Sequence, residues 1–196
     1  MTGRSPAPRV HKPAAVRRHE IIVSAAAEFA ESGLAGTRLE AIAASAGVSH
    51  PRVVQMFGSK RALFLDVVAW IFERVTDAFA AATAAHQAES GPLLVALGDA
   101  YRRLLQRDRV VALVMLHAYA ASGDATVRDE VAARYLALQH TVADATGADA
   151  MGVRTFFATG LLVTVSSALA LPGKRTDAQW GAWVLELVTP AVTRER

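Results

Sequence analysis

Residues 37–63 read TRLEAIAASAGVSHPRVVQMFGSKRAL and hold two short helical patterns separated by a glycine. The first pattern places Leu39, Ile42 and Ala43 on one side of a helix, as packing on a core requires. Residues 37–40, TRLE, have the form of a capping box, in which the threonine hydroxyl accepts from the backbone three residues on and the glutamate reaches back. A short helix is therefore predicted from this box up to the glycine.

A tight turn and a second short helix follow. Gly47 permits the sharp turn, and the apolar Val48 is expected to pack against the core there. Ser49 suits the N-cap of the second helix, and Pro51 lies in its first turn, where a missing N–H costs nothing. The helix is predicted to end near Phe57. This arrangement is typical of a helix-turn-helix, whose second helix enters the major groove of DNA.

The second helix has two unlike sides on a helical wheel. Val53 and Phe57 fall on one side, which is predicted to face the core. The residues on the opposite side are Pro51, Arg52, Gln55 and Met56. Arg52 can donate two hydrogen bonds to guanine or one to a phosphate, and Gln55 can pair with adenine. His50, at the helix start, can reach a base edge or a phosphate, whereas the proline and the methionine suit thymine methyls or sugars.

Helix starts around this motif supply candidate phosphate contacts, because their backbone N–H groups and dipole favour an anion. Thr37 and Arg38 open the first helix of the motif. Ser49 opens the second helix, and Lys60 opens the helix that follows. Each also has a simpler explanation as an N-cap or a surface charge, but they converge on one surface. The candidate DNA-binding residues are Thr37, Arg38, Ser49, His50, Pro51, Arg52, Gln55 and Lys60.

The motif lies in a basic amino-terminal region. Residues 1–13 hold three prolines among basic and polar residues, which predicts a flexible arm. From residue 14 apolar residues recur at helical spacing up to Gly33, a natural stop for a first helix. Residues 1–61 carry nine basic and four acidic residues, against 12 and 14 in residues 62–196. This asymmetry fits a polyanion-binding module joined to a second part, although charge alone fits a solvated surface equally well.

The remainder of the chain also shows helical patterns. A long helix capped by Ser59 is predicted up to about residue 86. Breaks at glycine and proline then define five helical stretches, at residues 92–106, 109–121, 124–146, 153–171 and 177–193. No stretch shows a sustained strand alternation. The chain is therefore predicted to be all-α with about nine helices, comprising an arm at residues 1–13, a helix-turn-helix domain at residues 14–61 and a second domain at residues 62–196.

Several short motifs stand at characteristic offsets between Arg17 and Val68. They are Ala26-Ala27-Glu28-Phe29, Gly33, Thr37, Glu40-Ala41-Ile42-Ala43, Ala46-Gly47-Val48-Ser49 and Phe57-Gly58-Ser59-Lys60-Arg61-Ala62-Leu63. With these motifs the stretch resembles the DNA-binding domain of the TetR (tetracycline-repressor) family of bacterial regulators. The resemblance implies that a homodimer binds a double-stranded DNA operator through two recognition helices. It also implies that the helical second domain holds the dimer interface and a site for a small-molecule effector of unknown identity.

The recognition helix departs from the family pattern at three positions. Val54 stands where the family usually has a tyrosine that touches a phosphate, and Met56 stands where it often has a histidine. Arg52 occupies a position that is more often threonine, and it can replace part of the lost phosphate affinity. A shifted operator preference is therefore expected.

The second domain offers candidates for dimerisation and ligand binding by composition alone. The last two helical stretches suit a four-helix interface, although an intramolecular core also explains their apolar residues, Phe156, Leu161, Leu162, Val165, Leu169, Trp180, Trp183, Val184, Leu187 and Val188. Residues that suit an apolar pocket are Trp70, Tyr101, Met115, His117, Tyr119 and Phe157. Core packing explains each of these more simply, so the sequence names no ligand-binding residue.

Several other classes of function find little support in the sequence. With no cysteine, and no histidine at metal-site spacing, no metal or cofactor is expected, and neither a nucleophile elbow nor a phosphate-binding glycine loop occurs. Residues 155–171 are nearly apolar but short for a membrane span, so a buried helix is expected. The basic residues 1–18 lack the apolar core of an export signal, so a cytoplasmic protein is expected.

The sequence therefore favours a ligand-responsive transcriptional regulator that is not an enzyme. Repression is the family default, and activation remains open. One alternative is a helical carrier or enzyme for apolar molecules, in which the first three helices are only structural. Another is a nucleoid protein that binds DNA without sequence preference.

Overall fold

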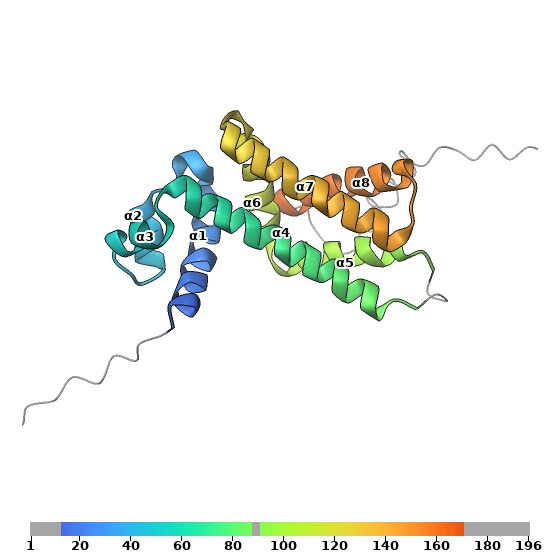
Figure 1. Cartoon of the computed structure of the whole chain (residues 1–196), viewed down its shortest axis with the longest axis horizontal. Coiled ribbons are helices and arrows are strands. Elements are labelled where there is room, and N and C mark those ends of the chain that lie inside the picture. Colours follow the sequence, from blue (N-terminus) through green and yellow to red (C-terminus); the bar gives the residue numbers. More distant parts are fainter. Residues whose placement is uncertain (1–12, 88–90, 171–196) are drawn as a thin grey trace, which may run out of the picture.

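A computed structural model describes residues 13–87 and 91–170 of the chain. Across these residues the protein is all-helical. The helices are α1 (Ala14–Gly36), α2 (Leu39–Ser45), α3 (His50–Phe57), α4 (Lys60–Ala85), α5 (Leu93–Arg107), α6 (Arg109–Ala120), α7 (Ala125–Thr146) and α8 (Ala150–Ala168), with a short 3-10 helix, η2 (Ala121–Gly123), between α6 and α7. Figure 1 shows α1, α2 and α3 gathered at one end, and α4 running from them into the second half of the molecule.

These helices correspond to eight of the nine expected from the sequence. The expected ninth helix, at residues 177–193, lies outside the described residues, as does nearly all of the expected arm. The start of α8 was predicted at residue 153, whereas the helix begins at Ala150. The reason is Asp149, whose carboxylate accepts a hydrogen bond from the Gly152 backbone N–H at 2.8 Å and so caps the helix one turn earlier.

The core of the amino-terminal half forms between α1 and α4. Ile21, Ile22 and Phe29 of α1 are buried, as the helical spacing predicts. The Phe29 ring meets the ring of Phe64 of α4 edge to face, with centroids 4.9 Å apart. From Leu63 onward the buried residues of α4 continue along one side of the helix, so this side is shared by both halves of the protein.

The end of α1 is shaped by Gly33. Its φ of 63° and ψ of −176° interrupt the helical geometry three residues before the helix ends. A side chain is strained in this conformation, so the predicted stop falls on the residue that can adopt it. A Cβ at this position would stand 2.7 Å from Nδ1 of His117 on α6. The glycine therefore also permits close packing between α1 and the second half of the molecule.

The capping box predicted at residues 37–40 does not form. The Thr37 side chain is buried, and its hydroxyl donates to the backbone carbonyls of Gly33 at 2.7 Å and Glu28 at 3.1 Å. Arg38 is the N-cap of α2 and makes no side-chain capping bond. The prediction was wrong because the threonine hydroxyl lies within hydrogen-bond distance of two carbonyls of α1, which the sequence of the box alone does not reveal.

Helix α8 presents much of its apolar surface away from the described part of the chain. Only Thr164 and Ala168 are buried, while Met151, Leu161 and Leu169 are exposed. The burial expected for this helix is thus not reached within the described residues. By length and composition α8 could cross a membrane, which is weak evidence, since core helices of soluble proteins pass the same test.

Replacing Gly33 by alanine is expected to lower the free energy of unfolding by about 1–3 kcal/mol from backbone strain alone. The contact with His117 adds to this loss, so His117→Ala should restore only part of the stability of Gly33→Ala. Gly123→Ala is the matched control, because a Cβ there meets nothing within 4 Å and φ is not positive. Urea denaturation measures the free energy of unfolding of wild type, Gly33→Ala, the double variant with His117→Ala, and Gly123→Ala. A Gly33→Ala variant as stable as Gly123→Ala would contradict the proposed strain.

Candidate nucleic-acid interface and inner cavity

Helix α3 is divided into a buried side and an outward side. Val53 is 0% exposed and Phe57 is 7% exposed, so these two side chains fix the helix to the core. The side chains of Pro51, Arg52 and Gln55 are exposed, and Met56 is half-buried. The orientation of the helix predicted from the wheel is confirmed by this burial.

Two outward side chains of α3 contact each other. Nη1 of Arg52 donates a hydrogen bond to Oε1 of Gln55 at 2.8 Å. This bond occupies one of the two lone pairs of the Gln55 amide oxygen, while the amide N–H groups and the other guanidinium N–H groups stay free. The pair therefore presents a surface rich in donors, which suits acceptors such as guanine N7 and O6 or phosphate oxygens.

The start of α3 carries two of the other candidates. Ser49 is exposed at the N-cap as predicted, but its hydroxyl makes no capping hydrogen bond. His50 is half-buried, with Nδ1 at 3.7 Å from Oε1 of Glu40 on α2. The glutamate that was expected to complete the capping box thus lies beside the first residue of α3.

The remaining candidates lie where α1, α2 and α4 meet. Arg38 is exposed at the start of α2. Lys60 is half-buried, and its ammonium donates to the backbone carbonyls of Ala35 at 3.1 Å and Thr37 at 2.9 Å. Thr37 has no side-chain surface to offer, because its hydroxyl and its backbone N–H both bond inside the protein. The structure thus brings seven of the eight candidates to accessible positions and places Thr37 in the interior.

Val54, which stands where the TetR family usually has a tyrosine that touches a phosphate, is 39% exposed on α3. The sequence pattern indicated no role for Arg18 of α1, which supports α3 from behind. The Arg18 guanidinium pairs with Asp66 of α4 at 2.7 Å and lies 4.7 Å from the centre of the Phe57 ring. No pattern within one helix could indicate the Arg18 contacts, because they join α1, α3 and α4.

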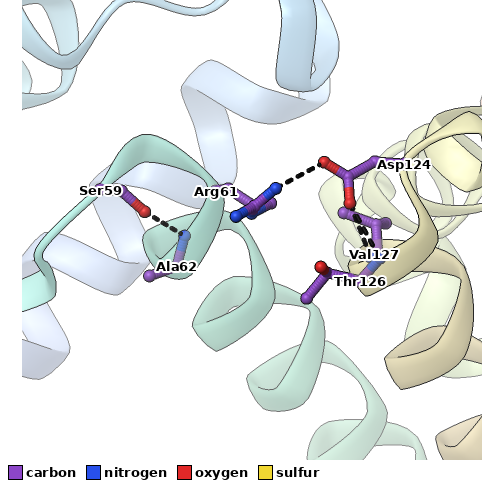
Figure 2. Close-up of polar contacts among 6 residues, drawn as sticks. All are labelled: Ser59, Arg61, Ala62, Asp124, Thr126 and Val127. Atoms are coloured by element: carbon purple, nitrogen blue, oxygen red, sulfur yellow. Dashed lines mark hydrogen bonds and ion pairs between the residues drawn. The ribbon is translucent and has the colours of Figure 1, made fainter.

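A polar junction joins the start of α4 to the start of α7. Nη1 of Arg61 lies 3.0 Å from a carboxylate oxygen of Asp124, and the other carboxylate oxygen accepts from the backbone N–H groups of Thr126 and Val127 (Figure 2). The Arg61 hydrogen bond, followed by that from Val127, holds the pKa of Asp124 below its ordinary value of 3.8. Asp124 therefore both caps α7 and pairs with Arg61, which lies in the first turn of α4, directly after the helix-turn-helix.

The second half of the molecule holds a cavity of about 350 Å³ that is partly open to solvent. Its wall comes from α4, α5, α6, η2, α7 and α8. The lining residues are Val75, Phe79, Tyr101, Met115, Tyr119, Ser122, Arg128, Val131, Ala132, Tyr135, Leu138, Phe156, Phe157, Gly160, Leu161 and Thr164. A mostly apolar cavity with a few polar groups is typical of a small-molecule site.

Four of the six residues suggested by composition line this cavity, and two lie elsewhere. The two are Trp70, which meets the His19 ring at 5.8 Å, and His117, which packs on Gly33. Within the cavity, the Tyr101 hydroxyl lies 2.6 Å from the hydroxyl oxygen of Thr164. The sequence could not indicate this pair, because 63 residues separate its members.

The cavity is a poor environment for charge at Tyr101 and Tyr119. Burial raises the pKa of Tyr101 to about 12, and burial also raises the pKa of Tyr119. Both phenols are therefore neutral hydrogen-bonding groups at physiological pH. In the described parts of the chain, no group of three or more metal-ligating side chains occurs that could hold a metal ion.

An exposed polar helix held on two partner helices, followed by a helical half with an internal cavity, defines the class of helix-turn-helix regulators. Residues 21–67 match the family model of bacterial regulatory proteins, tetR family. Through this amino-terminal region the chain is similar to TetR-family regulators. No curated protein matches it significantly.

Solved structures of similar fold include several TetR-family regulators. A TetR-like transcriptional regulator from Rhodococcus sp. RHA1 has a TM-score of 0.67 at 20% identity, over 90% of this chain and 98% of the other. The fatty acid degradation regulator FadR from Bacillus halodurans has a TM-score of 0.72 at 17% identity, over 95% and 100%. The multidrug binding protein EbrR, complexed with imidazole, has a TM-score of 0.63 at 23% identity, over 94% and 100%. At these identities the likeness establishes a shared fold.

The Arg61–Asp124 junction predicts a specific pH dependence. Because the pKa of Asp124 is lowered in the folded protein, its contribution to stability is present above the ordinary value of 3.8 and is lost as pH falls through the lowered pKa. Asp124→Asn keeps a capping side chain but removes the charge. The melting temperature of wild type should exceed that of the variant from neutral pH down to about pH 4, and the difference should shrink below that.

Asp149→Asn provides the control for this measurement. Asp149 caps α8 as Asp124 caps α7, but it forms no ion pair within the described residues. Its replacement should change the melting temperature less at neutral pH. Equal effects of the two substitutions at every pH would show that only the caps matter.

Proposed function

We propose that this protein is a repressor that leaves a palindromic operator when a small apolar or amphipathic ligand binds its second domain. The observation that carries the DNA-binding part is the exposed polar side of α3, with Arg52 and Gln55 outward and Val53 buried behind them. A helix held in this way can enter a major groove with its side chains directed at base edges. The proposed contacts are Arg38, Ser49, His50, Pro51, Arg52, Gln55 and Lys60, with Thr37 limited to supporting α1.

We further propose that two copies bind the operator together. The exposed apolar side chains Met151 and Leu161 of α8, and Leu169 at its C-cap, support an interface between copies, because exposed apolar surface is unfavourable in water. A two-fold interface matches a two-fold operator whose half-sites are about 34–36 Å apart. The domain boundary proposed near residue 61 assigns this surface to the second domain.

Helix α4 provides the proposed route from ligand to DNA. It begins three residues after α3 ends, and its residues Val75 and Phe79 line the cavity. A ligand that favours a different position of α4 would change the distance between the two recognition helices of a dimer. The fraction of protein with the operator-binding spacing then falls, as in any population shift.

The similar structures support a ligand-responsive role, which we propose the protein performs in the cytoplasm. FadR is described as a regulator of fatty acid degradation and EbrR as a multidrug binding protein. The alternative is a helical carrier or enzyme for apolar molecules, which the cavity alone would also suit. The alternatives separate on DNA: a regulator selects a palindrome from random duplexes, a nucleoid protein binds without selecting, and a carrier gives no complex.

The operator can be found by selecting bound sequences from a random duplex pool with the full chain. On the selected duplex, Arg52→Ala should reduce affinity by about 1–3 kcal/mol and relax the preference at one base pair, because a bidentate guanine contact is lost. Log affinity of wild type should fall steeply with log salt. Fluorescence anisotropy at several salt concentrations measures both effects.

Arg103→Ala is the matched control, since Arg103 is an exposed arginine on α5 and its loss removes the same charge. It should leave affinity and preference close to wild type. An equal loss for Arg52→Ala on every duplex would mean that Arg52 binds phosphate. Binding by Arg52→Ala equal to the control would remove α3 from the interface.

A further inference from the structure

The cavity of the second domain has an aromatic wall that is continuous from end to end. Five contacts between ring neighbours, with centroids 5.3 to 6.3 Å apart, link Tyr119, Tyr135, Phe157, Phe156, Phe79 and Tyr101 in this order. The chain has three tyrosines, and all three belong to this wall. Because aromatic rings pack well edge to face, such a wall suits a ligand that itself carries an aromatic ring.

The hydroxyl groups of the cavity wall differ in whether they already have a hydrogen-bond partner. The hydroxyls of Tyr101 and Thr164 lie 2.6 Å apart and bond to each other, and Thr164 also donates to the Gly160 carbonyl at 2.8 Å. The hydroxyls of Tyr119 and Tyr135 make no hydrogen bond with any described residue. The O–H groups of these two phenols are therefore free to donate to an acceptor on a ligand.

The described cavity wall carries positive charge but no negative charge. Among the described lining residues Arg128 is the one charged side chain, and neither aspartate nor glutamate is present. Arg128 lies near the start of α7 on the same side of the helix as Val131 and Tyr135, three and seven residues on. The wall thus offers a cation and two phenol donors to a bound group, but no anion.

Arg128 can exchange its present partner, Asp129, for a ligand. Its guanidinium pairs with Asp129 at 2.9 Å, and the two side chains are 55% and 70% exposed. An exposed ion pair of this kind contributes little to stability, so the arginine can turn to a ligand at small cost. Planar carboxylates are the partners that a guanidinium binds best among the common organic anions.

We infer that the cavity binds an aryl-alkyl carboxylate, with its ring against the aromatic wall and its carboxylate on Arg128 and the free tyrosine hydroxyls. This inference rests on the proposed ligand-responsive function and adds the chemical class of the effector. A cationic ligand of the same shape would bring its charge to Arg128 without a counter-ion in the described wall. A neutral one would lose the charge-assisted hydrogen bonds.

The test uses three probes with one skeleton: 4-phenylbutyrate, 4-phenylbutanamide and 4-phenylbutylamine. Isothermal titration of the full chain should give saturable binding of the carboxylate about tenfold tighter than that of the amide, with the amine weakest, because a hydrogen bond to a charged group is the stronger kind. Arg128→Gln should bring the carboxylate to the level of the amide and leave the amide unchanged. Arg103→Gln, an exposed arginine outside the cavity wall, should change neither affinity.

A second variant tests the location. Gly160 lines the cavity on α8, and a Cβ there would lie 3.9 Å from the Tyr101 ring. Gly160→Leu should occupy part of the cavity beside the Tyr101 ring, and binding of all three probes should be weakened. Thermal unfolding of both variants checks that they remain folded.

The results separate the ligand class from the proposed regulator. Binding of the amide or amine as tight as that of the carboxylate, unchanged carboxylate binding by Arg128→Gln or Gly160→Leu, or no saturable binding of any probe would each overturn the carboxylate assignment. These titrations contain no DNA, so they stand whether or not the chain selects an operator. Failure to select any duplex would overturn the regulator and leave the ligand result intact.

Discussion

Burial of one side of α4 is the constraint on which the rest of the structure depends. Leu63, Phe64 and Val67 hold the helix-turn-helix at one end of this helix, and Val75 and Phe79 line the cavity near the other. A helix transmits displacement along its axis because its backbone hydrogen bonds keep it stiff. Helix α3 and the cavity are therefore parts of one packed unit, so a change in packing around the cavity has a physical means to affect α3.

Two smaller contacts set how the halves meet. The close approach of His117 to Gly33 fixes α1 on α6 by shape, and the pairing of Arg61 with Asp124 fixes α4 on α7 by charge. The first is insensitive to salt because it is steric, whereas the second lies near the surface and weakens as ionic strength rises. Their different physical nature allows each to be altered without altering the other.

Much of the helix-turn-helix could be predicted from the sequence, since its determinants are local. The buried pair Val53 and Phe57, the cap at Ser59 and the turn at Gly47 follow from spacing and from conformational preference, and all three are present. The capping box at Thr37 failed because a residue 4 positions earlier competed for its hydroxyl. Local motifs predict well only where no neighbouring element offers a better hydrogen-bond partner.

By itself the sequence determined the helical class, the order of the helices and which side of α3 faces outward, because each depends on residues within a few turns of one another. Tertiary structure alone decided that Tyr101 meets Thr164, that Phe79 and Tyr135 share a cavity, and that Arg128 is its charged group in the described chain. These contacts join helices far apart along the chain. The apolar periodicity of one helix does not show which other helix packs against it. Only the packing of the whole molecule therefore determines which side chains line the cavity.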